Sequence, residues 1–162
     1  MSRLVSMVRR LQRQGRRIVL TNGCFDLLHP GHVLLLERAK RLGDVLVVAI
    51  NSDRSVKALK GPTRPMLPQR ARLTLVAALA SVDYVTVFDE MTPASVIDRL
   101  RPDVLVKGAD WKSGSVVGAN EVKRRGGRVV RLPLVDGYST TSLFHRIAQC
   151  RSNSSRRGPL YG

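Results

Sequence analysis

The sequence contains little cysteine, few aromatic residues and no long apolar segment. Cys24 and Cys150 are its two cysteines, too few for a disulfide framework, and neither stands in a CxxC pair. Aromatic residues make up 4% of the chain, so aliphatic side chains must fill the core. The run Val45–Ile50 is as long as any unbroken apolar run, far short of the roughly 20 residues that span a bilayer. We therefore expect a cytoplasmic protein with free thiols and no membrane segment.

Acidic residues are absent from both ends of the chain. Residues 1–17 carry six arginines and residues 151–162 carry three, so the ends hold nine of the sixteen net positive charges. The segment between them has nineteen basic against twelve acidic residues. A moderately basic domain suits phosphorylated small molecules, whereas basic ends are either solvated tails or a surface for nucleic acid. We expect solvated tails and no specific nucleic-acid binding.

Short β-branched runs alternate with amphipathic stretches from residue 18 to residue 149, without an internal repeat or a linker. These runs predict strands at Ile18–Thr21, Val45–Ile50, Tyr84–Phe88, Val104–Val106 and Arg128–Leu132. Helices are predicted at residues 30–42, Pro68–Ala80, Pro93–Leu100, Gly118–Arg125 and Thr141–Gln149.

Strands joined by crossover helices predict an α/β fold. We expect a single Rossmann-like domain with a five-stranded parallel sheet and helices on both faces, in which ligands bind beyond the carboxyl ends of the strands. The chain then divides into a basic N-terminal segment or helix (1–17), the domain itself (18–150) and a basic flexible tail (151–162).

The segment Thr21–His32, TNGCFDLLHPGH, joins the first strand to the first helix of the domain. His29 and His32 are three residues apart, so they lie near one face of the first helical turn, where unpaired N–H groups and the helix dipole attract an anion. Gly31 leaves room for a ligand to approach. This combination suits a phosphate group and the charge that develops on departing pyrophosphate. The alternative is that both histidines cap the helix or lie at the surface.

Later motifs add to this signature. They are KGPTRP at Lys60–Pro65, Arg72 ahead of Val82 and Asp83, VKGAD at Val106–Asp110, and DGYSTT at Asp136–Thr141. With HxGH behind TNGCFD, their order and spacing resemble the adenylyltransferase domain of the ADP-heptose synthases, which are cytidylyltransferase-like nucleotidylyltransferases, over roughly residues 16–149. The resemblance implies transfer of AMP from ATP to D-glycero-β-D-manno-heptose 1-phosphate, for lipopolysaccharide core synthesis. It also implies Mg²⁺, bound mainly through the nucleotide phosphates.

The same resemblance implies roles for individual residues. Catalytic roles fall on His29, His32 and Lys60. Nucleotide-binding roles fall on Thr21, Asn22, Gly23, Cys24, Phe25, Gly31, Arg64, Arg72, Lys107, Gly108, Asp110, Ser139, Thr140 and Thr141. Substrate-binding roles fall on Asp26 and Asn51, and no cluster of protein metal ligands is expected. A dimer is common among similar proteins, so we expect a homodimer.

Several of these residues have a structural alternative. Ser139–Thr141 precedes the last predicted helix, where Ser and Thr often serve as N-caps. Lys107 ends an apolar strand, so its ammonium group reaches either the nucleotide or the solvent. Asp26 and Asp110 either orient substrate or metal, or cap a turn. Trp111 is either a stacking surface or a packing residue.

Three other functions fit parts of the sequence. CTP-dependent cytidylyltransferases acting on glycerol 3-phosphate share HxGH and STT; Ala109 and Trp111 resemble them, whereas Cys24, the TRP triplet and Lys107 favour the heptose family. A dinucleotide-binding domain is disfavoured, because no GxGxxG follows the first strand. A nucleic-acid-binding module is motivated by the net charge, and trimming both termini would distinguish it from a transferase.

Overall fold

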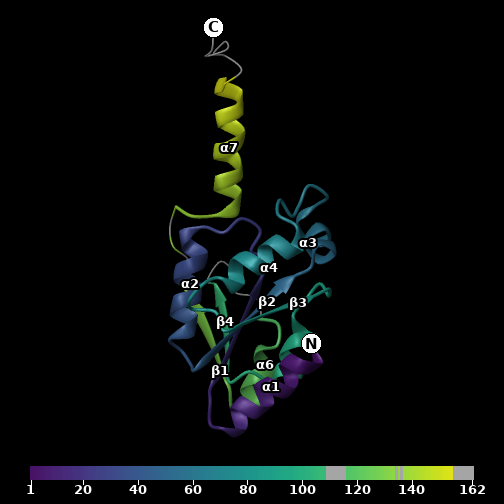
Figure 1. Ribbon diagram of the computed structural model, residues 1–162, viewed down its shortest axis with the longest axis vertical. Helices are drawn as coiled ribbons and strands as arrows, with labels where there is room; N and C mark the ends of the chain where they lie inside the picture. The colour runs from purple at the N-terminus through teal and green to yellow at the C-terminus, as the bar shows by residue number, and fades with distance from the viewer. Residues whose placement is uncertain (109–115, 134, 136, 155–162) are drawn as a thin grey trace.

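The computed structural model describes residues 1–108, 116–133, 135 and 137–154, and it contains a parallel five-stranded sheet with the order β3-β2-β1-β4-β5 (Figure 1). The strands are β1 (Ile18–Gly23), β2 (Val45–Asn51), β3 (Tyr84–Phe88), β4 (Val104–Gly108) and β5 (Arg128–Leu132). All five predicted strands are confirmed. β1, β2 and β4 run one or two residues further than predicted, and these extra residues bring their carboxyl ends to the site described below.

The helices are α1 (Ser2–Arg13), α2 (Pro30–Lys40), α3 (Asp53–Lys60), α4 (Gln69–Ala77), α5 (Ala94–Leu100), α6 (Ala119–Arg124) and α7 (Thr140–Ser154). The sequence did not predict α3. This eight-residue helix follows β2 almost directly, and its N-cap Ser52 accepts a hydrogen bond from the Ser55 backbone N–H at 3.2 Å. Lys60 is therefore the last residue of a helix rather than part of a loop.

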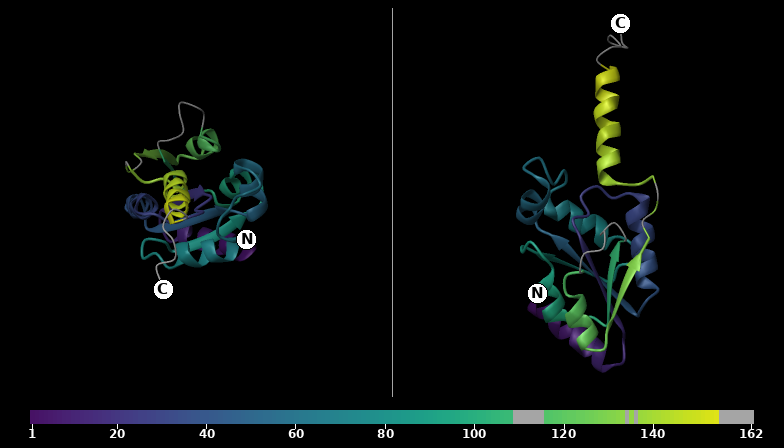
Figure 2. Two further views of the ribbon diagram at one scale, coloured as in Figure 1. Left: turned by 90° about the horizontal axis from the view of Figure 1, so that it is seen from above. Right: turned by 180° about the vertical axis from the view of Figure 1, so that it is seen from behind.

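Alternate residues of the strands face two separate cores, which explains why helices cover both faces of the sheet. Ile18 and Leu20 pack on one side with residues from α1, α5 and α6. Val19 packs on the other side with residues from α2 and α4, such as Leu36 and Val76. β2 is buried along its full length, as expected for a strand inside a parallel sheet. The predicted two-sided α/β architecture is confirmed (Figure 2).

α7 extends away from the body of the domain, at the end opposite α1 (Figures 1 and 2). The helix continues through residues 151–154, five residues beyond the predicted end at Gln149. The first part of the predicted flexible tail is thus helical, and residues 155–162 lie outside the described residues. In the part of the chain that is described, no helix is long and apolar enough to cross a membrane.

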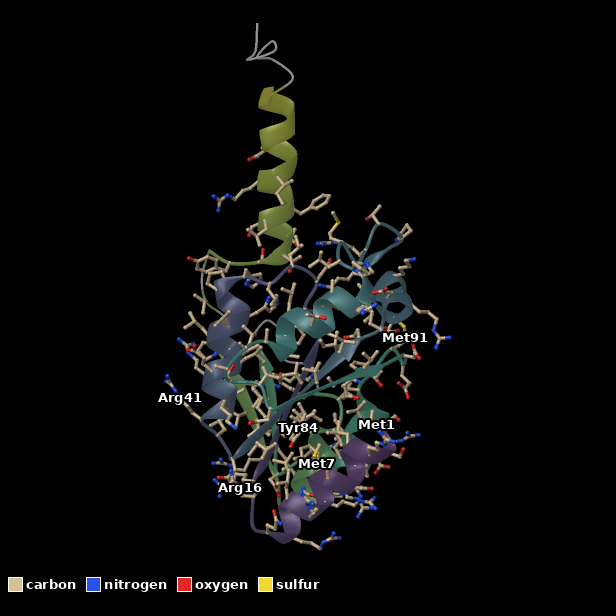
Figure 3. The ribbon with its side chains drawn as sticks, viewed as in Figure 1. Met1, Met7, Arg16, Arg41, Tyr84 and Met91 are labelled. Carbon is tan, nitrogen blue, oxygen red and sulfur yellow. The ribbon has the colours of Figure 1, made fainter. Side chains whose placement is uncertain are left out.

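Figure 3 shows which end of the sheet carries the candidate site. Met91 follows β3 and lies beyond the carboxyl ends of the strands, whereas Arg16, ahead of β1, lies toward the opposite end of the molecule. The candidate site residues come from the loops and helix starts on the Met91 side.

Candidate active site

A cavity of about 670 Å³ opens at the carboxyl ends of the strands. Eleven residues predicted for the site line it: Asn22, Gly23, Cys24, Phe25, Asp26, His32, Asn51, Lys60, Lys107, Gly108 and Thr140. They come from the ends of β1, β2 and β4 and from the helices that follow. Because neighbouring parallel strands end at the same edge, the fold brings together residues that are far apart in the sequence.

The turn from β1 to α2 presents the two histidines. Phe25 has a left-handed backbone conformation (φ 45°) that non-glycine residues seldom adopt, and its buried ring lies 5.1 Å from the ring of His32. A Cβ atom at Gly31 would lie 3.0 Å from His29 Nδ1 and 3.3 Å from the Tyr138 Cβ. The turn therefore has no room for a larger side chain between the histidines, and the approach of a ligand past Gly31 stays a prediction.

His29 and His32 form a stacked pair with ring centroids 3.8 Å apart. Both Nδ1 atoms are buried and have no hydrogen-bond partner among the described residues. Burial, the neighbouring His29 and the charge of Lys60 lower the pKa of His32 to about 4, and a hydrogen bond with the Leu27 backbone only partly opposes them. Burial also lowers the pKa of His29. At neutral pH the pair is uncharged and holds unused polar atoms beside the cavity.

The depressed pKa of His32 predicts that stability decreases in mild acid. Between the ordinary value of 6.5 and about 4, the folded protein binds fewer protons than the unfolded chain, so stability is lost as the pH falls through this range. We expect the melting temperature to fall from pH 7 to pH 5.5, and to fall less in His32→Gln, whose side chain does not titrate. Differential scanning calorimetry on both proteins measures this difference. An equal fall in both would show that His32 is not the responsible group.

Two lysines supply positive charge to the cavity. Lys107 is 7% exposed, and its Nζ donates to the side-chain oxygen of Asn22. Its ammonium group therefore stays inside the site, at the boundary between β4 and β1. Lys60 also lines the cavity, at the end of α3, and its charge acts on His32 as described above. An anion in the cavity would have two cations in the wall around it.

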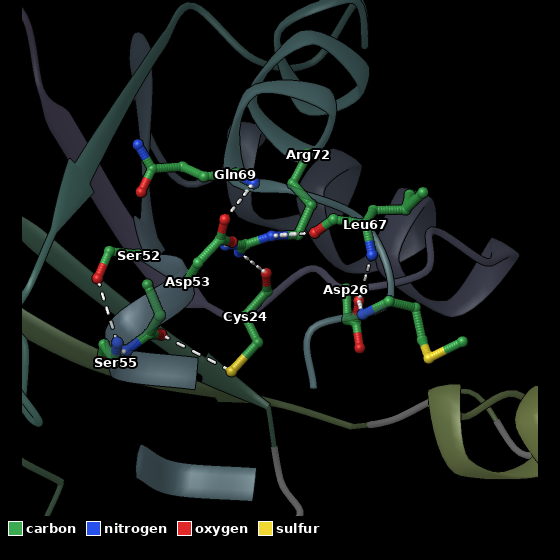
Figure 4. A network of polar contacts seen from close by, with 10 residues as sticks. Cys24, Asp26, Ser52, Asp53, Ser55, Leu67, Gln69 and Arg72 are labelled. Atoms are coloured by element: carbon green, nitrogen blue, oxygen red, sulfur yellow. Dashed lines mark hydrogen bonds and ion pairs between the residues drawn. The ribbon is translucent and has the colours of Figure 1, made fainter. Parts of the chain in front are cut away.

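Asp26 and Arg72 hold the loop between α3 and α4 against the end of β1, as Figure 4 shows, and Arg64 adds an ion pair with Asp26. Asp26 accepts from the Arg64 guanidinium at 2.6 Å and from the backbone N–H of Met66 and Leu67 at 2.6 and 3.2 Å. Asp26 is 1% exposed, so its carboxylate is buried and these three groups are its hydrogen-bond partners in place of water. The structure thus gives Asp26 and Arg64 an architectural role, although Asp26 also borders the cavity.

Arg72 is fully buried and does not line the cavity. Its guanidinium donates to the carbonyl oxygens of Cys24 at 2.5 Å and Leu67 at 3.1 Å, and to Asp53 at 2.8 Å. Asp53 in turn accepts from the N–H of Gln69, the first residue of α4. All three guanidinium nitrogens of Arg72 bind protein groups, and its predicted contact with the nucleotide stays a prediction. Sequence spacing indicated the position of this arginine but not the direction of its side chain.

Thr21, Ser139 and Thr141 are not among the residues that line the cavity. Thr21 is buried, and its hydroxyl donates to the Val106 carbonyl oxygen at 3.2 Å. Ser139 accepts from the Ser142 N–H at 3.0 Å, which is the expected N-cap contact at the start of α7. Thr141 is exposed on the first turn of that helix. Asp110, Ala109 and Trp111 lie outside the described residues.

Sequence reasoning missed the apolar part of the cavity wall. Its members are Leu35, Leu59, Met91, Thr92, Pro93, Val116 and Val117. Most are aliphatic residues that also occur throughout the core, and they carry no motif. Only their positions distinguish them: residues 91–93 lie between β3 and α5, Val116 and Val117 lie just ahead of α6, and Leu35 and Leu59 lie on α2 and α3.

The arrangement suits transfer of a phosphorus group between two bound ligands. Polar donors and cations surround a cavity large enough for a nucleotide, with His32 in its wall and His29 stacked on His32. The described residues contain no group of three or more His, Cys, Asp or Glu that could hold a metal ion. Asp26 is the one carboxylate among the lining residues described, and its oxygens already bind Arg64 and two N–H groups.

Three comparisons, with family profiles, with curated proteins and with solved structures, agree with one another. The profile of the cytidylyltransferase-like family matches residues 20–150. The bifunctional protein HldE of Koribacter versatilis is 54% identical over 90% of this chain, and that of Gluconobacter oxydans is 60% identical over 81% of it. The chain spans only 30% and 27% of the lengths of these two relatives. A lipopolysaccharide core biosynthesis protein from Thermoplasma volcanium superposes with a TM-score of 0.62 and 29% identity, covering 77% of this chain and all of that one.

Proposed function

Because this chain belongs to the cytidylyltransferase-like family and is a nucleotidyltransferase, we propose that it transfers AMP from ATP to D-glycero-β-D-manno-heptose 1-phosphate. The products are ADP-heptose and pyrophosphate. The observation that carries the proposal is the stacked, uncharged pair of His29 and His32, with buried Nδ1 atoms beside a cavity that also contains Lys60 and Lys107. The heptose acceptor is supported by the motif resemblance and by relatives named bifunctional protein HldE.

The proposed reaction is a direct displacement at phosphorus. An oxygen of the sugar 1-phosphate attacks the α-phosphorus of ATP, the new P–O bond forms, and the bond from the α-phosphorus to the bridging oxygen breaks to release pyrophosphate. A phosphate oxygen is already a nucleophile near pH 7, so no general base is required. His32, Lys60 and Thr140 line the cavity and are assigned to the leaving pyrophosphate. They act by holding the phosphates and stabilising the developing charge.

We propose that ATP enters as its Mg²⁺ complex. Asp26 is the only carboxylate among the described lining residues, and it already binds Arg64 and two N–H groups. This fits an ion held through the oxygens of the nucleotide itself, where it neutralises phosphate charge. With such an ion bound, His32, Lys60 and Lys107 would supply the protein's own hydrogen bonds and positive charge to the nucleotide phosphates.

A CTP-dependent transfer to glycerol 3-phosphate is the alternative within the same family. Phosphate groups are the same in every nucleotide, so the histidines, Lys60 and Thr140 do not select the base. We therefore assign selection of the base to groups near the end of β4 and ahead of α7. We expect a homodimer in the cytoplasm, where ATP is available, and sedimentation velocity tests the mass of the assembly.

Pyrophosphate release with each nucleotide and acceptor tests the proposal. With the heptose phosphate, we expect ATP to exceed CTP in kcat/KM by about 10- to 100-fold, because a pyrimidine in a purine pocket loses stacking area and leaves polar groups unpaired. Mass spectrometry identifies the ADP-sugar. If CTP gave the higher kcat/KM, or if glycerol 3-phosphate were the better acceptor, the glycerol phosphate assignment would replace this one.

A further inference from the structure

The cavity wall has two parts, which come from different halves of the strand order β3-β2-β1-β4-β5. β1, β4 and the start of α7 supply Asn22, Gly108 and Thr140. The other part comes from the β2 and β3 side, where Asn51 ends β2, Leu59 lies on α3, and residues 91–93 follow β3. We call this second set the β2–β3 wall.

The proposed function assigns different ligands to the two parts. His32, Gly108 and Thr140 surround the nucleotide and the departing pyrophosphate. Lys60, which is also assigned to the pyrophosphate, ends α3 at the border of the β2–β3 wall, so the part of the lining left for the acceptor is Asn51, Leu59 and residues 91–93. The acceptor sugar phosphate then lies against the β2–β3 wall. This step rests on the proposed function, and the rest of the argument rests on the hydrogen bonds within the wall.

One buried hydroxyl connects the members of this wall. The Ser55 Oγ accepts from the side-chain amide of Asn51 at 2.9 Å and donates to the Glu90 carbonyl oxygen at 2.9 Å. Ser55 is 1% exposed, so water does not readily replace either bond. The Glu90 carbonyl directly precedes residues 91–93, and Asn51 borders the cavity. A single side chain therefore sets the position of both.

The side-chain oxygen of Asn51 also has a partner, the thiol of Cys24. Burial raises the pKa of the Cys24 thiol, with the charges of Lys60 and Arg72 opposing the change, so the thiol stays protonated at neutral pH. The Cys24 Sγ lies 3.9 Å from the Asn51 side-chain oxygen and donates to it. The amide is thus fixed in one orientation, with its nitrogen toward Ser55 and its oxygen toward Cys24.

We propose that Ser55 is a positioning residue for the acceptor: through Asn51 and Glu90 it fixes the β2–β3 wall against which the sugar phosphate binds. Ser55 itself does not line the cavity and touches neither ligand. Loss of its hydroxyl frees the Asn51 amide and removes the donor to Glu90. The cavity wall on the nucleotide side has no bond to Ser55 among the described contacts and keeps its geometry.

The experiment compares Ser55→Ala with Ser52→Ala in the full chain. Ser52 is also buried, 4% exposed against 1% for Ser55, and its hydroxyl caps α3 by accepting from the Ser55 backbone N–H, with no bond to Asn51 or Glu90 among the described contacts. We expect Ser55→Ala to raise the acceptor KM by about tenfold, corresponding to loss of a buried hydrogen bond, with ATP KM within about twofold. Ser52→Ala is expected to lower the melting temperature while leaving both KM values near those of the wild type.

A double-mutant cycle with Asn51→Ala shows whether Ser55 acts through Asn51. If it does, Ser55→Ala adds little to the acceptor KM once Asn51 is already alanine. Additive effects, an equal rise in ATP KM, or the same acceptor KM change in Ser52→Ala would overturn the proposal. If the wild-type enzyme prefers a different sugar or polyol phosphate, the proposed function fails, and the same comparison with the preferred acceptor still decides the role of Ser55.

Discussion

Replacing His32 with alanine is expected to lower kcat by about a hundredfold or more, because groups that stabilise developing charge on phosphate oxygens typically have effects of this size. His32 lines the cavity, where its ring is proposed to donate to the phosphate oxygens of the bound nucleotide. We expect a similar loss for His29→Ala, since His29 stacks on His32 at 3.8 Å. Steady-state turnover with saturating ATP and acceptor measures both.

A matched control separates chemistry from folding. Leu34 lies on α2 with His32 but is 36% exposed and does not line the cavity, so Leu34→Ala is expected to keep near-normal kcat. Circular dichroism melting of each variant shows whether the helix is retained. A histidine variant with near-normal turnover would remove that residue from the mechanism, and loss of folding would favour the interpretation of the histidines as capping residues.

The sheet was predictable because its strands are short runs of aliphatic residues that are buried on both faces. Val45–Ile50 is the clearest example, and all of β2 is buried in the structure. α3 was not predictable in the same way. It has eight residues and follows β2 after one residue, and its start depends on a hydrogen bond between Ser52 and Ser55. Such a short helix gives too few turns for a periodic pattern.

The candidate site was predictable where a motif fixes the backbone and less so where side-chain direction matters. His32 and Lys107 were expected at strand ends or helix starts, and the structure places them in the cavity wall. Arg72 shares the basic character of these residues, yet its side chain points into the protein. Whether a charged group faces a ligand or a buried carbonyl depends on tertiary contacts such as those with Cys24 and Leu67.

Replacing Arg72 with methionine is expected to lower the free energy of unfolding by about 2–4 kcal/mol. Methionine retains most of the apolar volume but leaves the Cys24 and Leu67 carbonyl oxygens without their donor. Asp53 is 40% exposed and can turn toward water, which keeps the loss below that of a fully buried ion pair. Urea denaturation measures the change. Arg70→Met is the control, because Arg70 is exposed on the same helix and is expected to change stability little.

The same variant distinguishes the architectural role of Arg72 from the phosphate contact that the sequence suggested. Arg72 ties the Cys24 carbonyl to Asp53, and so joins the end of β1 to the start of α3. If it acts only in this way, Arg72→Met assayed well below its melting temperature keeps an ATP KM within a few-fold of the wild type. If Arg72 reaches the nucleotide phosphates during the reaction, ATP KM or kcat changes by tenfold or more while stability changes little, since a charge-assisted bond to phosphate is lost. A stable variant with a large kinetic defect would therefore require Arg72 to leave its buried contacts when ATP binds.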